Sequence, residues 1–119
     1  METPKIFDSE YKFCLILWEH EPVNSTQLVN LCKEQLGWSK ATTYTVIRRL
    51  AERGVLKNEN ATVTSLVSKE QVQEAELEEL VDKTFEGSIP SFIAAFSRSK
   101  RLTDQEVAQL QALIDSYRG

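Results

Sequence analysis

The chain contains few of the residues from which metal sites are built. Its 119 residues include one histidine and two cysteines. Cys14 and Cys32 lie inside apolar helical patterns rather than at the spacing of metal ligands, and one histidine cannot complete a tetrahedral zinc site with them. We therefore expect both cysteines to be reduced core residues, and we predict no metal and no other cofactor.

Catalytic groupings and long apolar runs are missing as well. The only histidine, His20, lies between Glu19 and Glu21, and no pattern pairs it with a nucleophile, so the sequence argues against an enzyme. The longest apolar run, residues 13–18, is far shorter than the ~20 residues of a membrane-spanning helix. Because no signal peptide is visible either, we expect a cytoplasmic protein without membrane insertion.

Basic charge is scarce overall but unevenly distributed. The formal net charge is -4, whereas strong DNA-binding proteins are often basic. Residues 1–67 hold eight Lys or Arg and eight Asp or Glu, while residues 68–119 hold six against ten. Within residues 38–57 the only acid is Glu52, and the cations there can contact several phosphates. These cations are Lys40, Arg48, Arg49, Arg53 and Lys57.

Residues 37–54 have the composition of a DNA recognition helix. Ser39 can cap it, and a buried stripe is predicted at helical spacing. The stripe consists of Thr43, Val46, Ile47 and Leu50. The opposite face is small, hydroxylated and basic, which suits a major groove. It consists of Ala41, Tyr44, Thr45 and Arg48.

The surrounding pattern predicts a winged helix. A first helix begins near a cap at Asp8 or Ser9, and a second begins at Asn24 and ends at Gly37. Two runs after Gly54 are rich in Val and Thr, residues 55–57 and 61–67, and a predicted turn at residues 58–60 separates them. This pattern predicts a β-hairpin, which would be the wing. We therefore predict a mainly α fold, with a winged-helix DNA-binding domain at residues 1–67.

Residues 68–119 are expected to form three more helices. Ser68 with Gln71 and Thr103 with Glu106 have the spacing of capping boxes, and Pro90 falls in the first turn of the middle helix. Some fifty residues bury apolar faces poorly alone, so we predict a dimerisation domain and a homodimer; packing within a monomer is the alternative. The predicted interface is Leu80, Phe92, Phe96, Val107, Leu110, Ile114 and Tyr117.

Several short motifs occur in an order that spans nearly the whole chain. They are Asp8-Ser9-Glu10-Tyr11, Gly37-Trp38-Ser39-Lys40, Arg49-Leu50, Gly54-Val55-Leu56 and Phe85-Glu86-Gly87-Ser88. This order resembles the penicillinase repressor family of bacterial transcription regulators, also called the methicillin-resistance and copper-operon repressor family. The resemblance implies a dimeric winged-helix repressor that binds a palindromic operator.

The chain departs from the resembled family on the recognition helix and in the wing. Members commonly carry a Lys and an Arg where this chain has Ala41 and Tyr44, so a bidentate Arg contact to guanine is not available there. We expect base contacts from Tyr44, Thr45 and Arg48, and a hydroxyl contact from Thr42 unless it only caps the helix. The wing, with Asn58-Glu59-Asn60-Ala61, should contact DNA weakly.

Phosphate contacts should therefore come from cations on and near the helix, although any one of them can instead be an ordinary solvated charge. The candidates are Lys40, Arg48, Arg49 and Lys57.

The resemblance also suggests how repression ends. Copper-responsive relatives carry a cysteine-rich tail, whereas this chain has no cysteine after Cys32, which argues against metal sensing by that route. Antibiotic-responsive relatives are inactivated when a membrane-bound sensor metalloprotease triggers cleavage in the C-terminal region. The corresponding bond lies between Ala95 and Phe96, where Ala95 replaces the family's Asn. Phe92 and Phe96 can equally be simple core residues.

A different class of function remains open. The chain could be a winged-helix protein-interaction module that does not bind specific DNA. Loss of the basic recognition face would favour that alternative, and Lys40, Arg48 and Arg49 argue against it.

Overall fold

The computed structural model describes residues 3–117 as mainly helical, with a small antiparallel sheet. The chain divides into two compact units between Glu76 and Leu77, inside one continuous helix. The predicted fold class, a winged helix followed by three helices, is confirmed. The predicted domain boundary between residues 67 and 68 stays a prediction.

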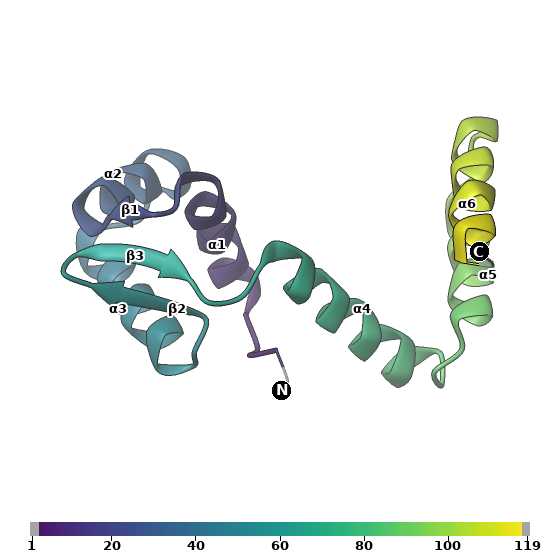
Figure 1. The fold of residues 1–119 in the computed structure, drawn as a ribbon, viewed down its shortest axis with the longest axis horizontal. Coiled ribbons are helices and arrows are strands. Elements are labelled where there is room, and N and C mark those ends of the chain that lie inside the picture. Colours follow the sequence, from purple (N-terminus) through teal and green to yellow (C-terminus); the bar gives the residue numbers. More distant parts are fainter. Residues whose placement is uncertain (1–2, 118–119) are drawn as a thin grey trace. The chain divides into compact units, whose positions relative to one another are not determined.

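The first unit contains three complete helices, a three-stranded sheet and the first part of a fourth helix (Figure 1). The helices are α1 (Asp8–His20), α2 (Ser25–Leu36) and α3 (Lys40–Glu52). The strands are β1 (Val23–Asn24), β2 (Leu56–Glu59) and β3 (Thr62–Ser65), in the order β1-β3-β2. β3 pairs antiparallel with both neighbours, so that Val63 lies opposite Val23 on one side and Asn58 on the other.

Side chains from every helix of this unit and from the sheet form one core. Phe13 and Leu17 of α1, Leu28 of α2, Leu50 of α3 and Leu56 of β2 are almost completely buried. The predicted stripe of α3 is confirmed, because all four of its members are buried. Burial also raises the pKa of the two cysteine thiols, to about 12 for Cys14 and about 11 for Cys32, so both are neutral core residues as expected.

The starts of α2 and α3 follow the sequence, whereas the start of α1 does not. The Asn24 side chain accepts a hydrogen bond from the Thr26 amide (2.9 Å), and Gly37 ends α2 with a positive φ of 70°. Neither Asp8 nor Ser9 caps α1, because the capping position is Phe7. Instead, the Glu10 carboxylate stabilises the start of α1 by accepting a hydrogen bond from the Phe7 amide at 2.9 Å.

The wing exists, but its turn lies further along the chain than the sequence suggested. Asn58 and Glu59 belong to β2 rather than to the turn. Asn60 and Ala61 make the turn, with positive φ values of 51° and 62°. Such a pair is the requirement of the two-residue hairpin turn whose twist matches that of the strands. Because Ala61 is not a usual residue for this conformation, composition alone pointed to the preceding residues.

The rest of the chain forms α4 (Lys69–Thr84), which crosses between the units, α5 (Ile89–Ser99) and α6 (Asp104–Tyr117). Both predicted capping boxes are confirmed: Ser68 and Gln71 bond reciprocally, as do Thr103 and Glu106. These bonds from Thr103 lower the pKa of the Glu106 carboxyl. Pro90 is the second residue of α5, where its missing N–H costs nothing.

Within residues 3–117, no helix has the length and apolar content that crossing a membrane requires. Over the same residues, no group of His, Cys, Asp and Glu is arranged to hold a metal ion.

Candidate nucleic-acid interface

The first turn of α3 is fixed by Ser39. The Ser39 hydroxyl oxygen accepts a hydrogen bond from the Thr42 amide (3.1 Å) and donates one to the Thr42 hydroxyl (3.0 Å). Lys40, Ala41 and Thr42 all remain exposed. Thr42 therefore does both things that the sequence left open, because it takes part in the cap and still presents its side chain to solvent. The first turn of a recognition helix is where base edges are usually contacted.

Thr43, which follows directly, belongs to the core. Its side chain is fully buried, and its hydroxyl donates a hydrogen bond to the Ser39 carbonyl oxygen at 3.1 Å. The prediction that Thr43 belongs to the buried stripe is confirmed.

Tyr44 is less free than the sequence suggested. Its side chain is half-buried and packs against the core, and its hydroxyl lies 3.2 Å from the Ser25 hydroxyl at the start of α2. The tyrosine thus joins α2 to α3 and can offer a base its ring edge and the remaining hydrogen-bonding capacity of the phenol. Thr45, beside it, is also half-buried.

Lys40, Arg48 and Arg49 are the cations that α3 presents to solvent. All three are exposed, and none forms an ion pair with another residue of the described range 3–117. Arg48 and Arg49 lie two turns after Lys40, so the three charges extend along most of the helix. Lys57 on β2 is also exposed, but its ammonium lies 3.9 Å from the Glu59 carboxylate on the same strand, a pair of little strength at the surface.

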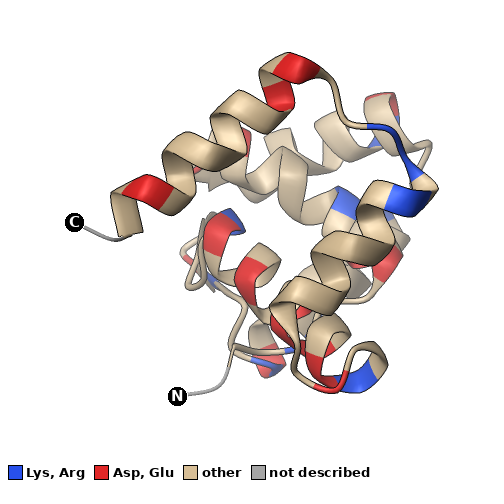
Figure 2. Ribbon diagram, turned by 90° about the vertical axis from the view of Figure 1, so that its right-hand side faces the viewer, with Lys and Arg blue, Asp and Glu red and all other residues tan. Residues whose placement is uncertain are grey.

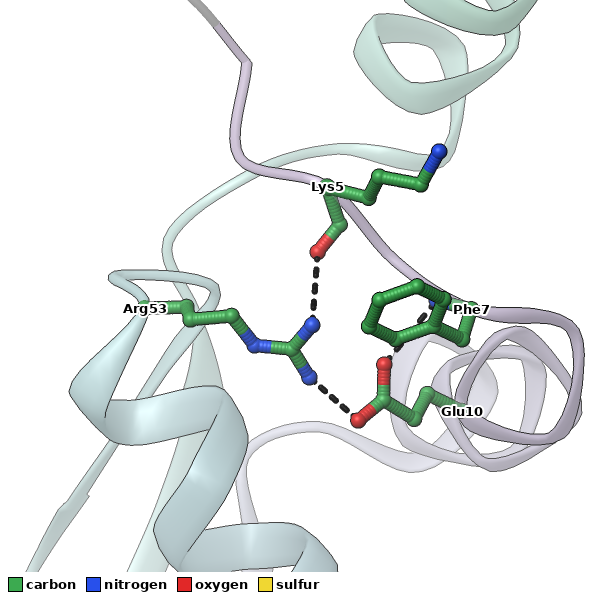
Figure 3. Close-up of polar contacts among 4 residues, drawn as sticks. All are labelled: Lys5, Phe7, Glu10 and Arg53. Atoms are coloured by element: carbon green, nitrogen blue, oxygen red, sulfur yellow. Dashed lines mark hydrogen bonds and ion pairs between the residues drawn. The ribbon is translucent and has the colours of Figure 1, made fainter.

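Arg53 does not belong to this cationic surface. Its guanidinium forms an ion pair with Glu10 of α1 and donates to the Lys5 carbonyl oxygen (3.2 Å), and its central carbon lies 5.2 Å from the centre of the Phe7 ring (Figure 3). The sequence analysis counted Arg53 among the cations available to phosphates, because Glu52 is the only acid near it in the sequence. That prediction was wrong, because Glu10 pairs with Arg53. Its partner is 43 residues away along the chain, beyond the reach of a local count.

The wing contributes little positive charge. Its turn consists of Asn60 and Ala61, and the exposed Glu59 side chain precedes them. That this wing contacts DNA weakly stays a prediction.

The described part of the C-terminal unit has few buried apolar residues. No residue of α5 or α6 is buried in the described chain. Among the predicted interface residues, Leu110 and Phe92 are half-buried, the latter edge-to-face with Phe85 at 5.5 Å. The other five are exposed, and so are four apolar residues outside the predicted interface. The exposed predicted residues are Leu80, Phe96, Val107, Ile114 and Tyr117; the further ones are Leu77, Ile89, Ile93 and Leu113.

Positive and negative charges lie in separate segments where α5 ends and α6 begins. Lys and Arg cluster at the end of α5 and in the turn before α6, as the blue segments in Figure 2 show. They are Arg98, Lys100 and Arg101, and all are exposed. Asp104 and Glu106 follow in the first turn of α6.

The penicillinase repressor family model matches residues 6–116. The chain belongs to the penicillinase repressor family. The sequence-based resemblance is thereby confirmed, and the family consists of transcriptional repressors, which are not enzymes.

Three curated proteins resemble the chain over almost its whole length. The penicillinase repressor of Bacillus licheniformis is 19% identical over 98% of this chain and 94% of its own length. The methicillin resistance regulatory protein MecI of Staphylococcus aureus is 23% identical over 96% of both chains. An uncharacterised 16.5 kDa protein of Latilactobacillus sakei is 28% identical over 94% of this chain and 80% of its own.

Two solved structures from the family share the winged-helix fold. One is the DNA-binding domain of the repressor BlaI, with a TM-score of 0.51 and 25% identity over 60% of this chain and 93% of that one. The other is monomeric BlaI of B. licheniformis in complex with the blaP half-operator, with a TM-score of 0.52 and 24% identity over the same shares, 60% and 93%.

The bond proposed from the family's cleavage reaction lies inside a helix. Ala95 and Phe96 are in the second half of α5, where Ala95 is half-buried and Phe96 is 41% exposed. Proteases prefer exposed, extended chain, so α5 would have to unwind locally before cleavage. Cleavage at this bond stays a prediction.

Proposed function

We propose that the chain is a cytoplasmic transcriptional repressor that binds a palindromic operator as a homodimer. The observation that carries the proposal is the exposed cationic face of α3, Lys40 with Arg48 and Arg49, on a winged helix of this family. Each copy would place α3 in the major groove of one half-site. Repression would follow because the bound dimer blocks access of the polymerase.

Within this proposal the cations and the hydroxyl groups have different tasks. Lys40, Arg48, Arg49 and, more weakly, Lys57 would contact phosphates and fix the orientation of the helix. Thr42, the free edge of Tyr44, Thr45 and Arg48 would contact base edges. A bidentate Arg contact to guanine is not available at position 44, so we expect an operator that differs from those of relatives with Arg there.

The homodimer is supported by the unburied apolar faces of α5 and α6. Two-fold symmetry would bring the same faces of two copies together and would match the symmetry of a palindrome. We further propose that a membrane sensor metalloprotease relieves repression through cleavage near Ala95 and Phe96.

The direct test is selection of DNA from a random duplex library with the purified full chain. We expect an enriched palindrome whose half-sites are centred about one helical turn apart. No enrichment, together with weak binding that depends only on salt, would favour the protein-interaction module instead.

Variants of the recognition helix make the test specific. Arg48→Ala and Arg49→Ala should each weaken binding to the selected site and reduce the slope of log K against log salt by about 1. Arg98→Ala removes the same charge from the C-terminal unit and serves as the control, with little expected change. Unchanged affinity for both α3 variants would overturn the assignment of α3 as the recognition helix.

A further inference from the structure

A groove of about 700 Å³ lies on the first unit, and none of its lining residues belongs to α3. It is lined by the last turns of α1, the end of β3, the residues that follow β3 and the first residues of α4. Leu15 and Leu66 are 38% and 53% exposed there, large values for apolar side chains of an otherwise well-buried unit. The volume is within the range of ~300–1,000 Å³ typical of sites for small molecules.

The polar groups of the groove wall are largely occupied by one another. The Trp18 indole N–H donates a hydrogen bond to the Val67 carbonyl oxygen at 3.0 Å. The Glu21 carboxylate accepts hydrogen bonds from both the amide and the hydroxyl of Ser65 at 2.8 Å, which fixes its position. What remains for a ligand is an apolar surface and the negative charge of the carboxylates.

That charge is not balanced within the groove. Glu19, Glu21 and Glu70 line it, and Lys69 is the one cation among the lining residues. Glu19 and Glu70 are exposed, so their oxygens can accept from a bound molecule. A surplus of negative charge repels phosphate, so the groove does not extend the DNA surface, whereas it attracts a cation.

We propose that this groove binds an organic cation with an apolar body, such as a lipophilic ammonium or other onium ion. The apolar part would contact Leu15, Leu66 and the Trp18 ring, and the charge would lie beside Glu19 and Glu70. Aromatic rings also attract cations that approach their faces, which adds to the carboxylate attraction. A neutral or anionic compound of the same shape would gain only the apolar contact.

The position of the groove gives such a ligand a regulatory consequence. Ser68 caps α4 at the edge of the groove, and α4 then continues without a break into the C-terminal unit. A ligand that holds the first turn of α4 against α1 and β3 would alter the affinity of a dimer for two fixed half-sites. This consequence rests on the proposed repressor function, whereas binding of the cation does not.

Tetraphenylphosphonium and tetraphenylborate provide a matched test, because they share a shape and differ in the sign of their charge. The full chain labelled with ¹⁵N would be titrated with each. We expect the cation to give saturable shifts at the Trp18 indole N–H and at the Leu66 and Ser68 amides, with an affinity at least about tenfold above that of the anion. Equal affinities, no binding at millimolar concentration, or shifts confined to α5 and α6 would overturn the proposal.

A charge-neutralising variant separates the carboxylates from the apolar wall. Glu19→Gln combined with Glu70→Gln should weaken binding of tetraphenylphosphonium about tenfold. Glu34→Gln combined with Glu52→Gln, on other exposed parts of the same unit, is the control and should leave binding unchanged. Loss of affinity in both double variants would mean general electrostatic attraction and would contradict the site.

Operator binding is then measured with and without the phosphonium ion. A shift in operator affinity in the parent chain, absent from the Glu19→Gln and Glu70→Gln variant, would support the regulatory consequence. Cation binding without such a shift would overturn that consequence alone. A chain that selects no operator would refute the repressor function and leave the titration result standing.

Discussion

The two compact units of the chain differ in how they bury apolar residues. The first unit contains a continuous core to which α1, α2, α3 and the sheet all contribute. In the second unit, among the described residues, only Val81 is buried, while Leu113 and Ile114 are more than half exposed. A unit of the first kind can fold by itself, whereas one of the second kind requires a further surface. The comparison supports our proposal that the first unit recognises DNA and the second unit assembles the dimer.

Disrupting α6 should have the largest effect. Replacing Leu110 and Ile114 together with Asp would place two carboxylates in the proposed interface, where a buried charge without a partner is very unfavourable. We expect the dimer to dissociate, with its Kd raised at least ~1,000-fold, or ~4 kcal/mol. Sedimentation equilibrium measures the change, and the fluorescence of Trp18 and Trp38 reports on the first unit, which should stay folded.

The control for this variant adds the same charge elsewhere on α6. Gln105 and Ala112 are exposed and lie on the side of the helix opposite its apolar stripe. Gln105→Asp with Ala112→Asp should leave the dimer intact. If the Leu110 and Ile114 variant also remained dimeric, the interface would have to lie on another face.

Truncating one leucine in each unit would distinguish burial within one chain from burial in the dimer. Leu50 is fully buried, so Leu50→Ala should lower the free energy of unfolding by ~3 kcal/mol at any protein concentration. Leu113 is 59% exposed in the single chain, so the effect of Leu113→Ala should come from the dimer and depend on protein concentration. Chemical denaturation at two concentrations separates the cases. A concentration-independent effect at Leu113 would place it in a core within one chain.

The ion pair of Arg53 with Glu10 should contribute less. Glu10 is only 7% exposed, so Arg53→Met would leave a largely buried carboxylate without its cation, at a cost of ~2 kcal/mol. Adding Glu10→Gln should restore part of the loss, because it removes the unpaired charge. Thermal unfolding of the single and double variants tests this, and the dimer constant should not change. A double variant less stable than Arg53→Met would contradict the explanation.

The features that the sequence predicted well are those that depend on neighbouring residues. The buried stripe of α3 follows from helical spacing, and the caps at Asn24, Ser39 and Ser68 follow from short-range hydrogen bonding. The cationic residues of α3 were identified for the same reason, since helix periodicity decides which side chains face solvent.

The features that it missed depend on contacts between distant parts of the chain. β1 has two residues and exists only because it pairs with β3. Arg53 was counted with the DNA-facing cations because its partner, Glu10, is in another helix. Tyr44 reaches the Ser25 hydroxyl on α2, which no pattern within α3 could show. The groove at the start of α4 likewise exists only once α1 and β3 are folded together.

The smallest expected effect on stability concerns the turn of the wing and tests its backbone conformation. Ala61 has a φ of 62°, a conformation that costs a residue with a Cβ ~1 kcal/mol and glycine almost nothing. Because glycine also loses more chain entropy on folding, Ala61→Gly should raise the unfolding free energy by only ~0.5 kcal/mol. Ala51→Gly, within α3, is the matched control and should lower it by up to ~1 kcal/mol. Urea denaturation with unchanged slope measures both, and destabilisation by Ala61→Gly would show that the turn in solution is not of the two-residue type.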